Sequence, residues 1–271
     1  MRIAWGSDVH FDFVDRPQVV EWAREIAEAG AEALLLGGDI ANARSLADWL
    51  ELVQSELAPR PVYFVLGNHD YYHGSIASVR ASARASSARW LAEGEPVLLD
   101  ATSALVGVGG WGDARTGNFL QSPVVLNDYR LIEDLARAGS RAALLPLLLA
   151  EGAREAAALK GPLTAALAAR ERVLVLTHVP PFREACWHEG KTSDDDWAPG
   201  FVCGAVGEVL LEAARAHPAR ELVVFCGHTH SPGRAELAPN LVVHTLGAEY
   251  GAPAFVTIET DALGGFRADV S

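Results

Sequence analysis

Five short clusters of Asp, Asn and His residues could carry chemistry in this sequence. Each holds one to three side chains of types that can bind a metal ion. The clusters read Asp8-Val9-His10, Gly38-Asp39, Gly67-Asn68-His69-Asp70, Thr177-His178 and Gly227-His228-Thr229-His230. Imidazole and carboxylate groups together suit Zn, Fe, Mn or Ni, whereas a site lined only by oxygen suits Mg or Ca. The residue types therefore indicate a transition-metal site.

The number of candidate ligands indicates two ions rather than one. A single ion with open coordination positions needs fewer side chains than the clusters supply. The candidate ligands are Asp8, His10, Asp39, Asn68, His178, His228 and His230. Two ions roughly 3.5–4 Å apart can clamp a phosphoryl group and lower the pKa of a bridging water. We therefore expect a dinuclear centre that hydrolyses phosphate esters.

Each of these residues also has an ordinary explanation when it is taken alone. Asp39 could cap the N-terminus of a helix, and His178 could be a structural histidine with satisfied hydrogen bonds. Their joint occurrence at similar places in the chain favours the metal site.

The clusters all follow short apolar runs that are typical of buried strands. The predicted strands cover residues 2–5, 33–36, 62–66, 97–99, 105–108, 173–176 and 222–225. Ligands in open α/β sheets bind at the carboxyl ends of the strands. This placement would bring five distant clusters to one edge.

Helix-like segments alternate with the early strands, at residues 17–29, 45–57 and 75–90. Such alternation predicts βαβ units and a sheet that is mostly parallel. The Ala-rich segment 131–170 is predicted to be helical, with interruptions at Pro146 and at Gly161-Pro162. Strands at 241–246 and 254–259 suggest a second sheet or an antiparallel edge. Without an internal repeat or a linker, residues 1–271 form a single expected domain.

The composition excludes some partners. The chain has 271 residues, 22 of them basic and 35 acidic, which gives a formal net charge of −13. This balance argues against extended nucleic acid and anionic membranes, because both are bound by fields of Lys and Arg. An acidic protein can still hold a phosphate-seeking pocket, since bound divalent ions reverse the local charge.

The cysteines and the apolar segments give an expectation for the cellular setting. Three cysteines, Cys186, Cys203 and Cys226, lack the spacing of a disulfide framework. The first residues lack the pattern of a signal peptide, and no apolar run approaches the roughly 20 residues that span a bilayer. We expect a cytoplasmic protein without membrane partners.

The five clusters, in this order, resemble the calcineurin-like metallophosphoesterases. That family carries an Asp-x-His, a Gly-Asp, a Gly-Asn-His-Asp/Glu, a lone His and a Gly-His-x-His, and all five are present here from Asp8 to His230. The resemblance implies an α/β fold, the four-layer α/β/β/α sandwich of two mixed sheets flanked by helices. It also implies two divalent or trivalent transition-metal ions, and a phosphodiesterase or phosphatase acting on a small phosphate ester.

The resemblance also implies a role for each residue. The first ion would be held by Asp8, His10 and His230, and the second by Asn68, His178 and His228. Asp39 would bridge the two ions, and the bridging water or hydroxide would be the nucleophile. His69 would be catalytic, steadying the phosphoryl charge and protonating the leaving oxygen. Asp70 would orient the imidazole of His69 by accepting its other N–H.

The sequence departs from the family pattern at two places. Ser7 stands where the family often has Gly, but this position is not a ligand. Ile40-Ala41-Asn42 follows Asp39, in place of the Asp-Arg-Gly continuation of the protein phosphatase branch. The sequence therefore favours the broader bacterial-type phosphodiesterases and phosphatases.

Two other functions are also compatible with the sequence. One is a non-catalytic scaffold that keeps the fold for binding, and the other is a nuclease acting on short oligonucleotides. The scaffold is disfavoured because all seven ligands and His69 are present. The residues above bear neither on the choice between monoester and diester nor on the oligomeric state.

Two segments could select the substrate, because loops at strand ends set specificity. Residues 180–204 could be a lid that includes His188, or a surface excursion packed by its own aromatic residues. Residues 111–130 end in Arg130, which could contact a phosphate or form a structural ion pair. No role is assigned to His73, His217 and His244, which are expected on loops or surfaces.

Overall fold

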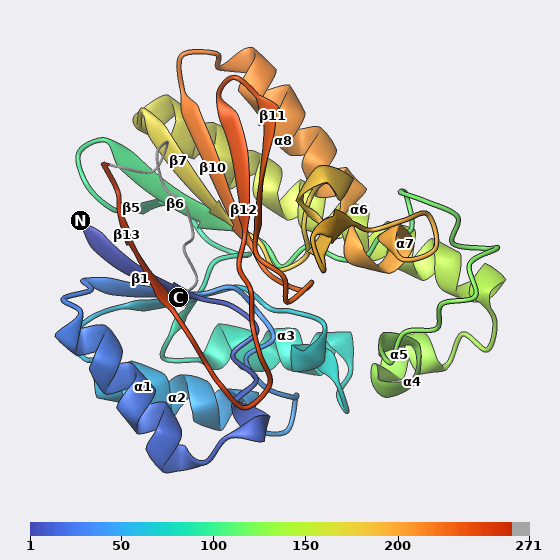
Figure 1. Ribbon diagram of the computed structural model, residues 1–271, viewed down its shortest axis with the longest axis horizontal. Helices are drawn as coiled ribbons and strands as arrows, with labels where there is room; N and C mark the ends of the chain where they lie inside the picture. Colours follow the sequence, from blue (N-terminus) through green and yellow to red (C-terminus); the bar gives the residue numbers. More distant parts are fainter. Residues whose placement is uncertain (262–271) are drawn as a thin grey trace.

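The computed structural model describes residues 1–261, which form two mixed β-sheets flanked by helices (Figure 1). The first sheet has the order β13-β1-β2-β3-β4. Its strands are β13 (Val256–Glu259), β1 (Arg2–Gly6), β2 (Ala33–Leu36), β3 (Val62–Phe64) and β4 (Arg89–Trp90). The second sheet has the order β11-β12-β10-β7-β6-β5. Its strands are β11 (Gly233–Ala238), β12 (Leu241–Thr245), β10 (Glu221–Cys226), β7 (Arg172–Leu176), β6 (Ser103–Gly107) and β5 (Val97–Leu98).

Each sheet is parallel in its centre and antiparallel at an edge. Strands β1 to β4 are parallel to one another, and β13 joins β1 in antiparallel register. In the second sheet β12, β10, β7 and β6 are parallel, while β11 and β5 pair antiparallel at the two edges. The sequence suggested a second sheet or an antiparallel edge, and the structure has both.

A hydrophobic core lies between the two sheets. The parallel strands are buried on both faces, so alternate residues of one strand enter different cores. In β10, Val223 and Phe225 face the other sheet, whereas Leu222 and Val224 face the outer helices. The rings of Trp5 and Phe225 meet between the sheets with centroids 4.6 Å apart. This contact holds the two sheets against each other near their carboxyl edges.

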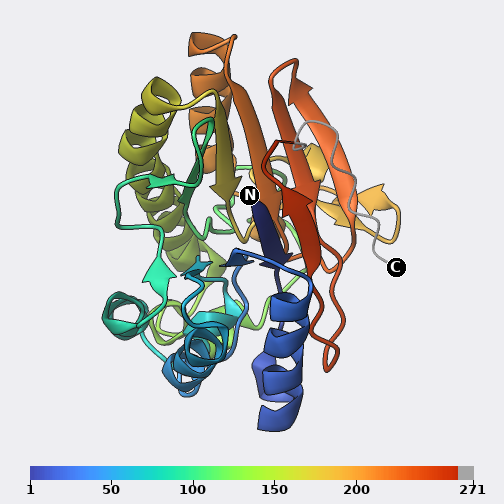
Figure 2. The same cartoon turned by 90° about the vertical axis from the view of Figure 1, so that its left-hand side faces the viewer.

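Helices cover the outer face of each sheet (Figure 2). The first sheet is covered by α1 (Arg16–Glu28), α2 (Leu46–Leu57) and α3 (Ile76–Ala85). The second is covered by α6 (Arg141–Ala169) and α8 (Gly204–Ala216). Asp15 and Ser75 form capping boxes that start α1 and α3. The predicted four-layer α/β/β/α sandwich is confirmed.

Two sequence predictions about helices were wrong. The expected interruptions at Pro146 and Gly161-Pro162 do not occur, because α6 runs unbroken from Arg141 to Ala169. A proline inside a helix costs about 3 kcal/mol, but Leu148, Leu159 and Leu163 of α6 are buried and offset this cost by packing. The predicted helix 75–90 stops at Ala85, since residues 89–90 instead pair with β3 as β4.

Two shorter segments lie beside the sandwich. We call residues 112–140 the arm; it carries α4 (Asp128–Leu131) and α5 (Glu133–Ala136) and extends to the right in Figure 1. Residues 180–204 hold the hairpin of β8 (Trp187–His188) and β9 (Lys191–Thr192), and also α7 (Ala198–Phe201). Short 3-10 helices occur at Phe11–Phe13, His69–Tyr71 and Arg183–Ala185. The two segments contact each other, since Asn118 N donates to Asp195 O at 2.8 Å.

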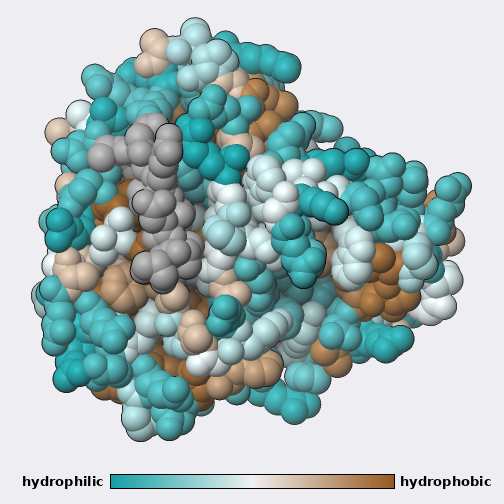
Figure 3. All heavy atoms as spheres, in the orientation of Figure 1, coloured by the Kyte–Doolittle hydropathy of each residue, from teal (hydrophilic) through white to brown (hydrophobic). Residues whose placement is uncertain are grey.

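The surface is mostly polar on the face seen in Figure 3, which is covered largely by hydrophilic residues, with apolar residues in scattered patches. Within residues 1–261, no helix combines the length and the apolar character needed to cross a membrane. Cys186, Cys203 and Cys226 are buried free thiols.

Gly38 provides a test of how tightly the strand ends are packed. Its φ is +87°, and a Cβ there would lie 2.7 Å from Gly67 N and 2.7 Å from the Cβ of His178. We expect Gly38→Ala to lower the free energy of unfolding by at least about 1–3 kcal/mol, from backbone strain alone. Urea unfolding followed by circular dichroism measures this change.

Gly94→Ala is the matched control, because the nearest atom to its added Cβ is 3.6 Å away. The control should change stability by less than about 0.5 kcal/mol. Equal stability of the two variants would contradict the tight packing at Gly38.

Candidate metal centre

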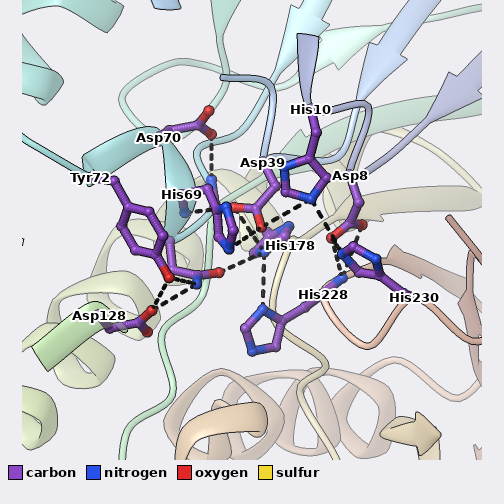
Figure 4. A network of polar contacts seen from close by, with 12 residues as sticks. Asp8, His10, Asp39, His69, Asp70, Tyr72, Asp128, His178, His228 and His230 are labelled. Carbon is purple, nitrogen blue, oxygen red and sulfur yellow. Dashed lines mark hydrogen bonds and ion pairs between the residues drawn. The ribbon is translucent and has the colours of Figure 1, made fainter. Parts of the chain in front are cut away.

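Strand ends from both sheets deliver the seven candidate ligands to one place (Figure 4). Strands β1, β2 and β3 are neighbours in the first sheet and are followed by Asp8 and His10, by Asp39, and by Asn68. Strands β7 and β10 are neighbours in the second sheet and are followed by His178, and by His228 and His230. The predicted convergence therefore involves the carboxyl edges of two sheets rather than one.

The backbone turns sharply at most of these positions. Five candidate ligands have left-handed φ values between +42° and +70°, and they are Asp8, His10, Asp39, His228 and His230. Left-handed backbone is uncommon outside glycine but is found more often for Asp and His. Hydrogen bonds hold two of the turns, from Asp8 N to Gly38 O and from His10 N to Asp39 O, each 3.0 Å long.

One group of ligand atoms surrounds Nε2 of His178. The Nδ1 atom of this ring lies 2.9 Å from Gly37 O, and this bond assigns the proton to Nδ1. The Nε2 atom therefore presents a lone pair. It lies 3.1 Å from Asn68 Oδ1, 3.2 Å from His228 Nδ1 and 3.3 Å from Asp39 Oδ1.

The other members of this group are acceptors as well. His228 Nε2 lies 3.1 Å from Gly200 O, so its proton is on Nε2 and its Nδ1 is unprotonated. The amide oxygen of Asn68 also carries only lone pairs. Three acceptor atoms, from His178, His228 and Asn68, thus face one another without a proton between them. A carboxyl oxygen of Asp39 lies beside them, and a cation satisfies such a set. The residues present fit a metal ion.

A second group gathers around His230. Its Nε2 lies 3.3 Å from Asp8 Oδ1 and 3.3 Å from His10 Nε2. The Oδ2 atom of Asp39 lies 3.9 Å from His10 Nε2, while its Oδ1 faces His178. The two oxygens of Asp39 therefore face different groups, as a carboxylate between two ions would.

Burial keeps three of the imidazoles neutral. It lowers the pKa of His10 and of His228 to about 3, with nearby histidines adding to the effect at His228. It also lowers the pKa of His178. At neutral pH these three histidines are therefore in the form that binds metals. Burial raises the pKa of Asp39 well above its usual value, and the charges of Asp8 and Asp70 raise it further.

His69 lies beside both groups and faces the open side of the site. Its backbone N–H donates to Asp39 Oδ1 at 2.8 Å, and its Nε2 lies 3.9 Å from Asp39 Oδ2. The ring stacks on Tyr72 with centroids 4.2 Å apart. Burial, followed by the charge of His178, lowers the pKa of His69 to about 4.

Asp70 makes different contacts from those expected. Its carboxylate accepts backbone N–H groups from Ile40 and Ala41 through Oδ1, and from Gly67 through Oδ2. No hydrogen bond to the His69 ring is formed among its described contacts. Burial raises the pKa of Asp70 to about 7, although the backbone N–H groups oppose this shift. Asp70 therefore ties together the turns that carry Asp39 and Asn68.

Four further residues touch the candidate ligands and were not selected from the sequence for these contacts. Ser7 Oγ lies 2.6 Å from Asp8 Oδ2, and the ring of Tyr250 lies 4.4 Å from that of His10. Tyr72 and Asp128 contact Asn68. Ser7 adjoins a motif, so its position was a usable signal. Asp128 and Tyr250 are remote from every motif in the sequence, and only the fold brings them here.

A cavity of about 730 Å³ opens over the candidate ligands. Its floor includes Asp39, Asn68, His69, His228 and His230. The walls come from the arm, from the 180–204 segment and from Tyr250. Among the described residues that line the cavity, Lys191 is the only Lys or Arg.

The structure also places three other residues that the sequence singled out. His188 is exposed and lines the cavity, whereas Arg130 is not among its lining residues and forms no ion pair within residues 1–261. His244 was expected on a loop or surface, but it is buried in β12 and its ring stacks against Phe225.

A known structure shares this architecture. A dimetal phosphatase from Danio rerio superposes with a TM-score of 0.58 and 16% identity, over 95% of this chain and 91% of the other. At this identity the comparison shows the fold alone. Two further structures are less similar. The protein TT1561 of Thermus thermophilus has a TM-score of 0.47 and 15% identity, over 91% and 88% of the two chains. The 5'-nucleotidase of Candida albicans has a TM-score of 0.41 and 12% identity, over 91% and 45%.

Sequence comparison gives the family. A search among curated proteins found no match. The family model described as calcineurin-like phosphoesterase matches residues 1–232 of the 271. The predicted family is thus confirmed by a match over most of the sequence, and the chain belongs to the calcineurin-like phosphoesterases.

Proposed function

We propose that this protein is a metal-dependent hydrolase of phosphate esters, a phosphodiesterase or phosphatase with a dinuclear centre. The observation that carries the proposal is the position of His178 Nε2, which faces two other acceptor atoms, His228 Nδ1 and Asn68 Oδ1, without a proton between them and has a carboxyl oxygen of Asp39 beside it. The second group around His230 lies beside it and shares Asp39. Family membership supports the same reaction class.

The ligands divide between two positions. Asp8, His10 and His230 would hold one ion, and Asn68, His178 and His228 the other, with Asp39 between them. The Ser7 hydroxyl and the backbone N–H of His228 both lie within hydrogen-bond distance of the Asp8 carboxylate, so they fix its orientation. Two bound ions would lower the pKa of a shared water and polarise the phosphoryl oxygens.

His69 is the group proposed to handle the proton. Its ring lines the cavity and lies 4.7 Å from the ring of His10, a position from which it would reach an oxygen that leaves the phosphorus. Burial makes the imidazole neutral in the ion-free protein, but an anionic phosphoryl group beside it would raise its pKa. His69 would therefore acquire its proton as substrate binds and donate it to the leaving oxygen. Asp70 supports this site by positioning its turns.

The hairpin of residues 187–192 is proposed to act as part of a lid. Its base is fixed: Trp187 packs against Gly233, where a Cβ would lie 2.1 Å from the indole, and Cys186 Sγ lies 2.9 Å from Ser193 Oγ. Four of its residues line the cavity, and they are His188, Glu189, Lys191 and Thr192. A single Lys in a cavity of this size supports a small substrate rather than extended nucleic acid.

Metal binding provides the first test. We expect two Mn²⁺ ions per chain by elemental analysis, and a higher melting temperature when they bind. When the free Mn²⁺ concentration is a hundred times the Kd of a site, binding at that site adds about 2.7 kcal/mol to the free energy of unfolding. EDTA should reverse the shift, because the facing acceptors then lose their cation.

Two single-histidine variants control this experiment. His178→Ala should lose at least one ion, whereas His217→Ala, at the end of α8, should bind both. A wild-type protein that binds no divalent ion and hydrolyses no phosphate ester would instead support the non-catalytic scaffold.

The role of His69 is tested by its alanine variant. We expect kcat to fall roughly 10²–10⁴-fold, the usual range for a general acid, while two ions remain bound. The loss should be larger for phenyl esters than for p-nitrophenyl esters, since p-nitrophenolate leaves without a proton. Monoester and diester substrates are assayed in parallel. Undiminished turnover would remove His69 from the reaction, and equal losses for both leaving groups would exclude proton donation.

The chain has two lysines, and they make a matched pair for testing the hairpin. Lys191 lines the cavity, whereas Lys160 pairs with Glu212 on the outer helices. Lys191→Ala should raise KM roughly 10–100-fold, because a charge-assisted contact to the anionic substrate contributes about 1.5–3 kcal/mol. Lys160→Ala should leave KM and kcat unchanged. A wild-type KM in Lys191→Ala would show that the hairpin lies outside the bound substrate.

A further inference from the structure

The side-chain amide of Asn68 could lie in either of two orientations, and only one presents oxygen to the candidate metal position. In the structure Oδ1 lies 3.1 Å from His178 Nε2, while Nδ2 donates to Asp128 Oδ1 at 2.9 Å. Reversing the amide would exchange these two atoms. Asn68 would then offer an N–H where an ion requires a lone pair.

The reversed orientation would be favourable as far as His178 is concerned. Since His178 donates through Nδ1 to Gly37 O, its Nε2 can only accept. A reversed amide would donate an N–H to this atom and form an ordinary hydrogen bond. In the observed orientation two acceptors face each other instead. Another group must therefore hold the amide as it is.

Asp128 is placed to do so. Its Oδ1 accepts from Asn68 Nδ2 at 2.9 Å and from the hydroxyl of Tyr72 at 2.7 Å, so two donors converge on one oxygen. Reversal would turn Asn68 Oδ1 toward this carboxylate and leave a buried acceptor against another acceptor, which is costly. Asp128 is 8% exposed, so water has little access to relieve that contact.

We propose that Asp128 is a positioning residue for the metal site, acting through Asn68. It holds the amide with its oxygen toward the ion that His178 and His228 would share. The inference rests on the proposed function in one respect, namely that Asn68 is a ligand. It assigns a role to a residue of the arm, 60 positions along the chain from Asn68.

Asp128 could alternatively serve only to anchor the arm, and the structure offers a control for this. Asp134 lies on the same arm and accepts from the backbone N–H of Ile76 at 2.7 Å, which ties the arm to α3. It makes no described contact with a candidate ligand. Loss of Asp134 would disturb the anchoring of the arm without releasing the amide of Asn68.

The experiment is a calorimetric titration of the metal-free protein with Mn²⁺. In Asp128→Ala we expect the Kd of one ion to rise 10–100-fold, the usual effect of removing a group that orients a ligand. The other ion should bind as in the wild type. Asp134→Ala should bind both ions with wild-type affinity. Unchanged affinities in Asp128→Ala, or an equal loss in Asp134→Ala, would overturn the inference.

A double-mutant cycle tests whether Asp128 acts through Asn68. Asn68→Ala should weaken the same ion, and adding Asp128→Ala should weaken it no further. A full additional loss in the double variant would contradict the proposal. If Asp128→Ala fails to fold, Asp128→Asn decides the question, because it keeps an acceptor oxygen but can also donate. Its affinity should fall between those of the wild type and Asn68→Ala, and wild-type affinity would count against the inference.

The wild-type titration separates this inference from the proposed function. If the wild type binds no Mn²⁺, the dinuclear hydrolase itself is wrong. If it binds two ions and Asp128→Ala does the same with equal affinity, only the role of Asp128 is wrong.

Discussion

The structure depends on a group of atoms that repel one another unless a cation lies among them. Nε2 of His178 and Nδ1 of His228 come from the second sheet, whereas the oxygens of Asp39 and Asn68 come from the first. Contacts between the sheets keep these atoms together, including the Trp5–Phe225 ring contact and the bond from His228 N to Asp8. The energy of folding thus holds the lone pairs of both imidazoles and of the Asn68 amide toward one another, and binding a cation would convert their repulsion into attraction.

Backbone geometry shows where this arrangement is costly and what supports it. Five candidate ligands have left-handed backbone, which costs of order 1–3 kcal/mol at a residue other than glycine. The support comes from groups that are not ligands themselves. Asp70 gathers three backbone N–H groups from two turns, and Gly67 leaves room for Asp39, since a Cβ there would lie 2.2 Å from its Oδ1. The positions of the candidate ligands therefore depend on the packing around them as well as on the ligand groups themselves.

Much of this could be predicted from the sequence, because the candidate ligands follow apolar runs and parallel strands end at the same edge of their sheet. All seven candidate ligands lie together, and the four-layer sandwich follows from the family pattern. The continuity of α6 could not be predicted, since it depends on burial that outweighs two prolines. The hydrogen bonds of Asp70 depend on how two turns meet, and its motif suggested a different partner. Asp128 belongs to no motif, and only the path of the arm brings it to Asn68.

The arm contributes both to the wall of the cavity and to the support of a candidate metal ligand, and in enzymes these two roles often fall to separate segments. Leu126 and Asn127 contribute to the wall of the cavity, and the next residue, Asp128, bonds to a candidate metal ligand. An insertion or replacement that reshapes this wall would also displace the carboxylate beside Asn68. Evolution of a new substrate preference through the arm would therefore be constrained by the need to keep the ion. The hairpin of residues 187–192 lacks a described bond to any candidate ligand, so it is the freer place for such change.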